Sequence, residues 1–328
     1  MTRPARALAL ALAAASLAVL GAPAASAEPL VPNPWLTRRV LNMEHQGGEI
    51  EAPSDTLFAL KTSVQKGADM LEIDVHATAD NQIVVLHDTK VNRTTNSGGR
   101  VDKLTLAQIK MLDAAHWFVP ACGTCHNRPE SAYAYRGFAN GRRAIPPDLF
   151  AAGFRKNDFK IPTLIEVFKA FPKIPINIEI KNSIPDTAGY EKILARIIRN
   201  HGRTHDTIVV SFLDHAVEQF KIHAPDVATA TATVETALFY ASAYGPLPGA
   251  PNPRYVALQV PMVFSGIPVL SADFIAGAHA NGLAVHAWTI NDRATMEQLI
   301  DWGVDGIMTD LPTLLEQVLT ERGVRYVP

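Results

Sequence analysis

Short apolar runs alternate with longer helical patterns along most of the chain, and this alternation limits the fold more than any other feature. Apolar runs of four to seven residues between turn signals are typical of buried strands. The expected strands are residues 40–45, 69–75, 174–180, 207–211, 227–230, 255–259, 284–288 and 306–309. Expected helices between them include residues 55–65, 187–200, 214–223, 272–280 and 293–302. Such a series of β-α units predicts a (β/α)8 TIM barrel. An open doubly wound sheet is the alternative, but its Gly-rich dinucleotide loop is absent.

Two segments interrupt the alternation. After the second strand, Asp80-Asn81-Gln82 marks a turn and residues 83–86 form another extended run, which predicts an early hairpin at the barrel rim. Residues 115–160 form a long insertion, and loops of that length are usually functional or disordered. We expect this insertion to lie over the active-site mouth. Its aromatic residues would either contact an acyl chain or lipid surface, or pack within the loop; they are Trp117, Phe118, Tyr133, Tyr135 and Phe138.

The first residues have the features of a secretory signal peptide. Arg3 and Arg6 precede an apolar stretch at residues 8–20, and Ala25-Ser26-Ala27 supplies a cleavage site. We therefore expect a cleaved peptide at residues 1–27 and one domain at residues 28–328. No second long apolar stretch follows, so the mature chain is expected to lack a transmembrane segment. The protein would then be secreted or held in the cell envelope.

Charge and cysteine content narrow the partners. The formal net charge is −2, which argues against a broad nucleic-acid surface. In an oxidising compartment, Cys122 and Cys125 are candidates for a local disulfide, with free thiols and a metal knuckle as alternatives.

Acidic residues gather on two of the expected strands. Glu72 and Asp74 are two residues apart on one strand and therefore share a face. Glu179 on the next strand offers a third oxygen ligand, and three carboxylates without cysteine suit one hard divalent cation, Ca²⁺ or Mg²⁺. Lys181 shares a face with Glu179 and would bind a phosphate oxygen. The alternative is a solvated surface or an ion pair between Lys181 and a carboxylate.

Two histidines end expected strands beside these carboxylates. His45 ends the first strand and His87 ends the hairpin. Because imidazole titrates near neutral pH, such a pair is suited to general acid–base catalysis. A single histidine is more often structural, and most of the 11 in this chain are expected to be.

Eight short motifs follow one another along the chain. They are His45-Gln46-Gly47-Gly48 and residues 67–75, 84–88, 92–95, 161–164, 177–181, 287–289 and 303–310. Together, and in this order, they resemble the glycerophosphodiester phosphodiesterase family. The resemblance implies a TIM barrel with an early hairpin that hydrolyses glycerophosphodiesters to glycerol phosphate and an alcohol.

The resemblance also implies roles for the candidate residues. Glu72, Asp74 and Glu179 would bind the metal, and His45 and His87 would be the acid–base pair, with neither role assigned. In the substrate site, the implied residues are Lys181 and Gln46 at the phosphate and Trp288 as an apolar wall. Core packing is the alternative for Trp288, and a glycosylation sequon is the alternative for Asn92-Arg93-Thr94.

The chain departs from the family pattern at two positions. The family normally has arginine where this chain has Gln46, and glutamate where it has Ser54. A neutral amide cannot grip phosphate as a guanidinium does, so the phosphate environment is expected to differ.

Three rival functions stay open at the sequence level. A phosphatidylinositol-type phospholipase C barrel and a sphingomyelinase D-like barrel fit the Asn-Ile-Glu-Ile-Lys segment at residues 177–181 less well. A binding protein on a decayed barrel is supported by Gln46 and Ser54 alone. Within the resembled family, a lysophospholipase D acting on lysophospholipids is the alternative to the action on small glycerophosphodiesters.

Overall fold

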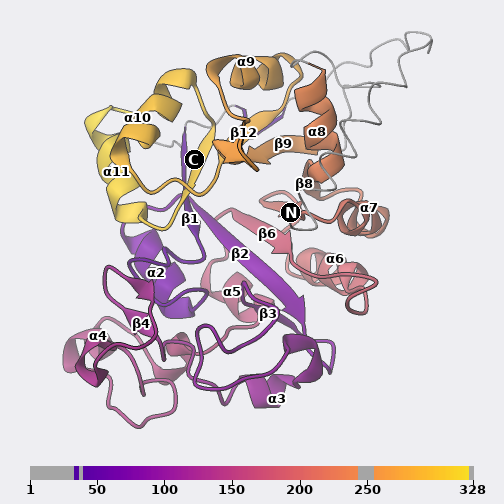
Figure 1. The fold of residues 1–328 in the computed structure, drawn as a ribbon. Helices are drawn as coiled ribbons and strands as arrows, with labels where there is room; N and C mark the ends of the chain where they lie inside the picture. Colours follow the sequence, from indigo (N-terminus) through magenta and orange to yellow (C-terminus); the bar gives the residue numbers. More distant parts are fainter. Residues whose placement is uncertain (1–32, 37–39, 243–254, 325–328) are drawn as a thin grey trace.

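A closed barrel of parallel strands forms the centre of the computed structural model, which describes residues 33–36, 40–242 and 255–324 (Figure 1). Within these residues the sheet runs β1-β13-β12-β9-β8-β7-β6-β2, and β1 also pairs with β2 to close it. The predicted TIM barrel is therefore confirmed. Its strands are β1 (Leu41–His45), β2 (Met70–Ala77), β6 (Ile176–Ile180), β7 (Thr207–Val210), β8 (Ala228–Ala230), β9 (Tyr255–Val260), β12 (Ala284–Ala287) and β13 (Gly306–Thr309).

A helix follows each barrel strand and packs on the outside of the barrel (Figure 1). Local sequence fixes several helix ends: Thr56 caps the first helix by accepting from the Ala59 N–H, and Gly303 ends another in the left-handed region at φ 84°. The helices are α2 (Leu57–Gln65), α5 (Leu164–Ala170), α6 (Glu191–Asn200), α7 (Asp214–His223), α8 (Thr233–Ala241), α9 (Ala272–Ala280), α10 (Arg293–Trp302) and α11 (Pro312–Glu321).

Apolar side chains fill much of the barrel interior. Leu41, Met43 and Met308 are among those that pack there, in one cluster with Trp35, which is 1% exposed. The side-chain amide of Asn33 donates to the carbonyls of Val256 and Gly282 and so holds Trp35 in place. The carboxylates and histidines described below lie toward the end where the strands finish.

The early hairpin is present: β3 (Ile83–Val85) pairs antiparallel with β2. Between β3 and β6 the chain forms η1 (Val101–Lys103), α3 (Leu106–Ile109), β4 (Phe118–Val119), β5 (Gly123–Thr124), η2 (Glu130–Ala132), α4 (Pro147–Ala151) and η3 (Lys156–Phe159). The remaining elements are the two strands of a small hairpin after β9, β10 (Val263–Phe264) and β11 (Ile267–Pro268).

The insertion at residues 115–160 lies on the α2 side of the barrel (Figure 1). Phe58 of α2 stacks or tilts against Tyr135, Phe154 and Phe159, with ring centroids 4.6–4.7 Å apart. We expected this segment to lie over the mouth; it flanks the rim instead and contributes no side chain to the cavity described below. Its aromatic side chains pack with one another and with Phe58, and Phe118, Tyr133 and Phe138 are at most 2% exposed, which agrees with the alternative of packing within the loop.

Cys122 and Cys125 form a disulfide in the β4–β5 hairpin, with Cα atoms 6.1 Å apart. The signal peptide expected at residues 1–27 lies outside the described residues. In the described part of the chain, no helix combines the length and apolar character needed to cross a membrane.

Candidate active site

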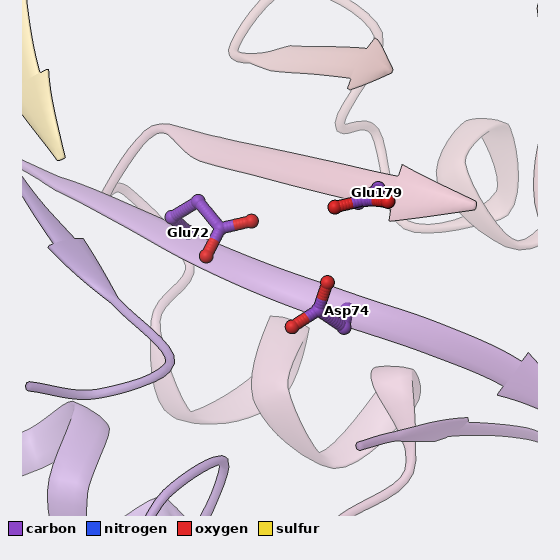
Figure 2. Close-up of side chains that lie close together, drawn as sticks. All are labelled: Glu72, Asp74 and Glu179. Carbon is purple, nitrogen blue, oxygen red and sulfur yellow. The ribbon is translucent and has the colours of Figure 1, made fainter. Parts of the chain in front are cut away.

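Three acidic side chains converge between β2 and β6 (Figure 2). Glu72 and Asp74 project from the same face of β2, and the pairing of β2 with β6 places Glu179 directly beside Asp74. Each residue offers an oxygen, and these oxygens all lie within 4.8 Å of one another. Glu72 and Asp74 are almost completely buried. The strand register thus concentrates three carboxylates in one small volume.

The cluster carries more negative charge than the neighbouring Lys181 balances. Lys181 Nζ lies 3.2 Å from both Asp74 Oδ1 and Glu179 Oε1. Burial, followed by the Asp74 charge, raises the pKa of Glu179 to about 7 and holds the pKa of Glu72 well above its ordinary value. Burial also acts to raise the pKa of Asp74, but Lys181 and the two histidines outweigh it, so that this pKa is lowered. A further positive charge would therefore stabilise the cluster.

The donor atoms fit a divalent cation. Glu72 Oε2 and Asp74 Oδ2 are buried without a hydrogen-bond partner among the described residues. Buried polar atoms normally have partners, so these unpartnered oxygens in a cluster that could hold a metal ion are consistent with a bound cation. A set made only of carboxylate oxygens suits Mg²⁺ or Ca²⁺ and does not distinguish them.

His45 lies at the end of β1, held by two neighbours. Its Nδ1 is 2.6 Å from Asp310 Oδ1, and its Nε2 is 3.1 Å from Gln46 Nε2. Asp310 is itself held by Asn291, whose amide donates to Oδ2 at 2.7 Å. Burial acts to lower the pKa of His45, but the Asp310 hydrogen bond and the nearby carboxylates reverse this and raise it to about 9.

His87 lies across the carboxylates from His45, just beyond β3. Its Nδ1 is 2.7 Å from Asp88 Oδ1, and its backbone N–H donates to Asp55 Oδ2 at 2.9 Å. Arg93 Nε donates to the other oxygen of Asp88 at 3.1 Å. Each histidine therefore has a carboxylate on Nδ1, so a proton exchanged with a substrate would pass through Nε2, which in His45 also contacts Gln46.

Gln46 contacts the His45 ring and does not line the cavity described below. It is 2% exposed, and its backbone is in the left-handed region at φ 53°. Its Oε1 accepts from Ser54 Oγ at 2.8 Å and from Arg93 Nη2 at 3.2 Å. The two positions that depart from the resembled family are thus in direct contact.

One cavity of about 360 Å³ joins the polar cluster to an apolar lobe. His45, His87, Glu72, Glu179 and Lys181 line the polar end. The apolar lobe is lined by side chains from the β7–α7 loop, α8, the β10–β11 hairpin and the end of β12, among them Phe212, Ala237, Tyr240, Phe264, Ile267 and Trp288. The Trp288 ring meets the Phe212 ring edge to face, with centroids 5.6 Å apart. Trp288 is therefore a wall residue of the cavity and not part of the closed core.

The partners of the histidines were not among the residues selected from the sequence. Asp310 follows β13 directly and Asp88 follows His87, so both stood at strand ends that the sequence had marked. Arg93 lies in a loop that matched the family pattern without an assigned role. A search for carboxylates next to strand-end histidines would have found Asp88, whereas the contact between His45 and Asp310 depends on β1 pairing with β13.

Comparisons with known proteins agree with this geometry. The sequence profile of the glycerophosphoryl diester phosphodiesterase family matches residues 45–314. The chain is 31% identical to a glycerophosphodiester phosphodiesterase from Caldanaerobacter subterraneus subsp. tengcongensis, over 87% of this chain and 100% of that protein. It is 26% identical to lysophospholipase D GDPD1 of Rattus norvegicus, over 85% of each chain. Its fold is similar to that of an Oleispira antarctica phosphodiesterase in complex with the product sn-glycerol-3-phosphate, with a TM-score of 0.61, 22% identity, and coverage of 85% of this chain and 96% of that one.

Proposed function

The chain belongs to the glycerophosphoryl diester phosphodiesterase family and is a phosphoric diester hydrolase, and we propose that it uses a divalent cation and the pair His45 and His87 to cleave glycerophosphodiesters. The observation that carries the proposal is the convergence of both histidines and the carboxylate cluster on one cavity. A binding protein on a decayed barrel would not need to retain all of these groups in contact distance.

In the proposed reaction, the phosphate lies between the two histidines. Glu72, Asp74 and Glu179 would hold the cation, which would neutralise charge on a nonbridging phosphate oxygen. Lys181 would hold a second phosphate oxygen as a point charge. The position of Lys181 Nζ, 3.2 Å from two of the carboxylates, supports this role.

The two histidines would move the protons. One takes a proton from the attacking hydroxyl as its oxygen bonds to phosphorus, and the other gives a proton to the alcohol oxygen as the P–O bond breaks. Attack by water yields glycerol phosphate and the free alcohol directly. Attack by the neighbouring glycerol hydroxyl yields a cyclic phosphate first, and water then opens the ring to the same product.

Hydrolysis of glycerophosphocholine tests this proposal. We expect release of glycerol phosphate that stops with chelator and returns with Ca²⁺ or Mg²⁺. His45→Ala and His87→Ala should each abolish turnover, whereas His215→Ala on the exposed surface of α7 should not. Chelator-resistant turnover would remove the cation from the proposal, and near-normal turnover of either active-site variant would remove that histidine.

The apolar lobe favours a second candidate substrate, a lysophospholipid. Tyr240 Oη donates to the Pro268 carbonyl at 2.9 Å and so ties α8 to the β10–β11 hairpin, which closes the lobe on one side. Phe212 of the β7–α7 loop, Val234 of α8 and Val263 of β10 are 42–54% exposed. An acyl chain in the lobe would bury apolar surface that a small substrate leaves in water.

Narrowing the lobe separates the two substrates. Ala237 is buried on the cavity face of α8, so Ala237→Trp should lower kcat/KM for lysophosphatidylcholine by about tenfold or more and spare glycerophosphocholine. Ala151→Trp on the exposed surface of α4 is the matched control. If the wild type shows no preference for the monoacylated substrate, the lobe does not select an acyl chain.

A further inference from the structure

Gln46 and Ser54 stand at two positions where the resembled family usually has charged residues, arginine and glutamate. Arginine to glutamine removes one positive charge and glutamate to serine removes one negative charge, so the two replacements together leave the net charge unchanged. Ser54 Oγ donates to Gln46 Oε1 at 2.8 Å, and both residues are 2% exposed. A second charged group at either position would lie close to the Arg93 guanidinium, which is 3.2 Å from Gln46 and 3.5 Å from Ser54.

The contacts of Gln46 fix which way its amide points. A guanidinium only donates, so the amide atom that faces Arg93 Nη2 is the oxygen. The amide NH₂ group must then face His45 Nε2, which is 3.1 Å away. When the His45 ring is neutral, Nε2 therefore accepts from that NH₂, and the ring proton lies on Nδ1, where Asp310 accepts it at 2.6 Å.

We propose that Gln46 is a positioning residue, which orients the His45 ring through Nε2 while Ser54 and Arg93 orient Gln46. The inference rests on the proposed role of His45 in the reaction. Gln46 itself is buried and does not line the cavity, so it is expected to act through the His45 ring. The family's arginine is a donor without an acceptor atom and could not accept from Arg93 in this arrangement.

A positioning role affects turnover and not substrate affinity. Gln46→Met keeps the side-chain length and removes both hydrogen-bonding atoms, and Gln46→Glu keeps the acceptor for Arg93 and Ser54 but removes the donor to His45. We expect each variant to lower kcat for glycerophosphocholine about tenfold, the usual effect of one lost buried hydrogen bond, with KM within about twofold of wild type. Gln317→Met, which removes a surface amide that donates to Glu321, is the matched control and should change neither constant.

A second series tests whether Ser54 acts through Gln46. Ser54→Ala should lower kcat less than Gln46→Met, and the double variant should be no slower than Gln46→Met alone, because both act on the same amide. Thermal unfolding midpoints of all variants separate turnover effects from loss of folded protein.

Each outcome bears on the inference. A rise in KM with unchanged kcat would mean that Gln46 contacts the phosphate, and additive effects of Ser54→Ala and Gln46→Met would mean that Ser54 acts elsewhere; either result overturns the positioning role. Wild-type turnover by Gln46→Glu would show that the donor to His45 is unimportant. A wild-type chain without diesterase activity would overturn the proposed function, and the positioning role with it.

Discussion

Removing the cation should destabilise the folded protein by an amount that can be worked out in advance. A ligand that binds only the folded state stabilises it by RT ln(1 + [L]/Kd), about 2.7 kcal/mol when the free cation is at one hundred times its Kd. For a domain of this size, with an unfolding entropy of about 0.6 kcal/mol/K, that corresponds to a rise in Tm of about 4–5 °C. The three carboxylates and their unpartnered buried oxygens are the structural origin of the expected binding energy.

The effect of a carboxylate substitution should depend on whether the cation is present. Without cation, Glu72→Gln relieves repulsion among buried carboxylates, so its Tm should be no lower than that of the wild type. With cation, the same variant should lose most of the rise in Tm. Asp273→Asn on the exposed surface of α9 should keep the full rise.

The assay is differential scanning calorimetry of chelator-treated protein, titrated with Ca²⁺ or Mg²⁺ at pH 8. At pH 6 the rise should shrink, because the pKa of Glu179 is about 7 and a proton then competes with the cation. The reasoning is refuted if neither cation changes the wild-type Tm, or if Glu72→Gln and the wild type respond equally.

Three further predictions follow from other contacts. Asp310→Asn should lower kcat at least about tenfold with little change in KM, because the amide no longer holds the Nδ1 proton of His45. Steady-state kinetics will measure both constants. An unchanged kcat would mean that Asp310 is dispensable. His286 is buried in the barrel, and burial lowers its pKa to about 4. Between pH 6.5 and 4 the unfolded chain therefore binds a proton that the folded protein excludes. The free energy of unfolding should fall by roughly 3 kcal/mol as the pH decreases through that window. Urea unfolding at several pH values will measure this, and His286→Gln should have a smaller slope than the wild type; an equal slope would contradict the assignment. Phe58→Ala removes the ring that contacts three aromatic rings of the insertion and should cost about 3–5 kcal/mol in urea unfolding, whereas a loss below about 1 kcal/mol would mean that the insertion is only loosely held.

The barrel could be predicted because the local sequence pattern indicates each of its strands and helices. Each strand is an apolar run that ends in polar residues, and the expected helices at residues 214–223, 272–280 and 293–302 agree with the observed α7, α9 and α10. The position of the insertion could not be predicted in the same way. The sequence does not distinguish aromatic residues that cover a cavity from those that fill a core, as Tyr135 and Phe138 show. In the structure they pack in one cluster with Phe58 of α2.

The carboxylates and histidines could be placed because parallel strands finish at the same end of a barrel. The contact of His45 with Asp310 depends on two distant segments of the chain, which the sequence alone does not bring together. The contacts of Gln46 could not be predicted from the sequence either. It follows His45 directly, so the sequence placed it at the phosphate. Its backbone is in the left-handed region at φ 53° and its side chain contacts Ser54 and Arg93, so its place at the phosphate stays a prediction.

The insertion is connected to the active site through this same network. The His126 ring, next to the disulfide, lies with Nε2 3.0 Å from the Arg93 carbonyl, and Trp117 Nε1 donates to the Thr95 carbonyl at 2.8 Å. Both contacts hold the loop that carries the Arg93 guanidinium to Gln46 and Asp88. Since Gln46 contacts His45 and Asp88 contacts His87, one arginine bridges the supports of both histidines. The insertion therefore supports the Arg93 loop from outside the cavity, to which it contributes no side chain.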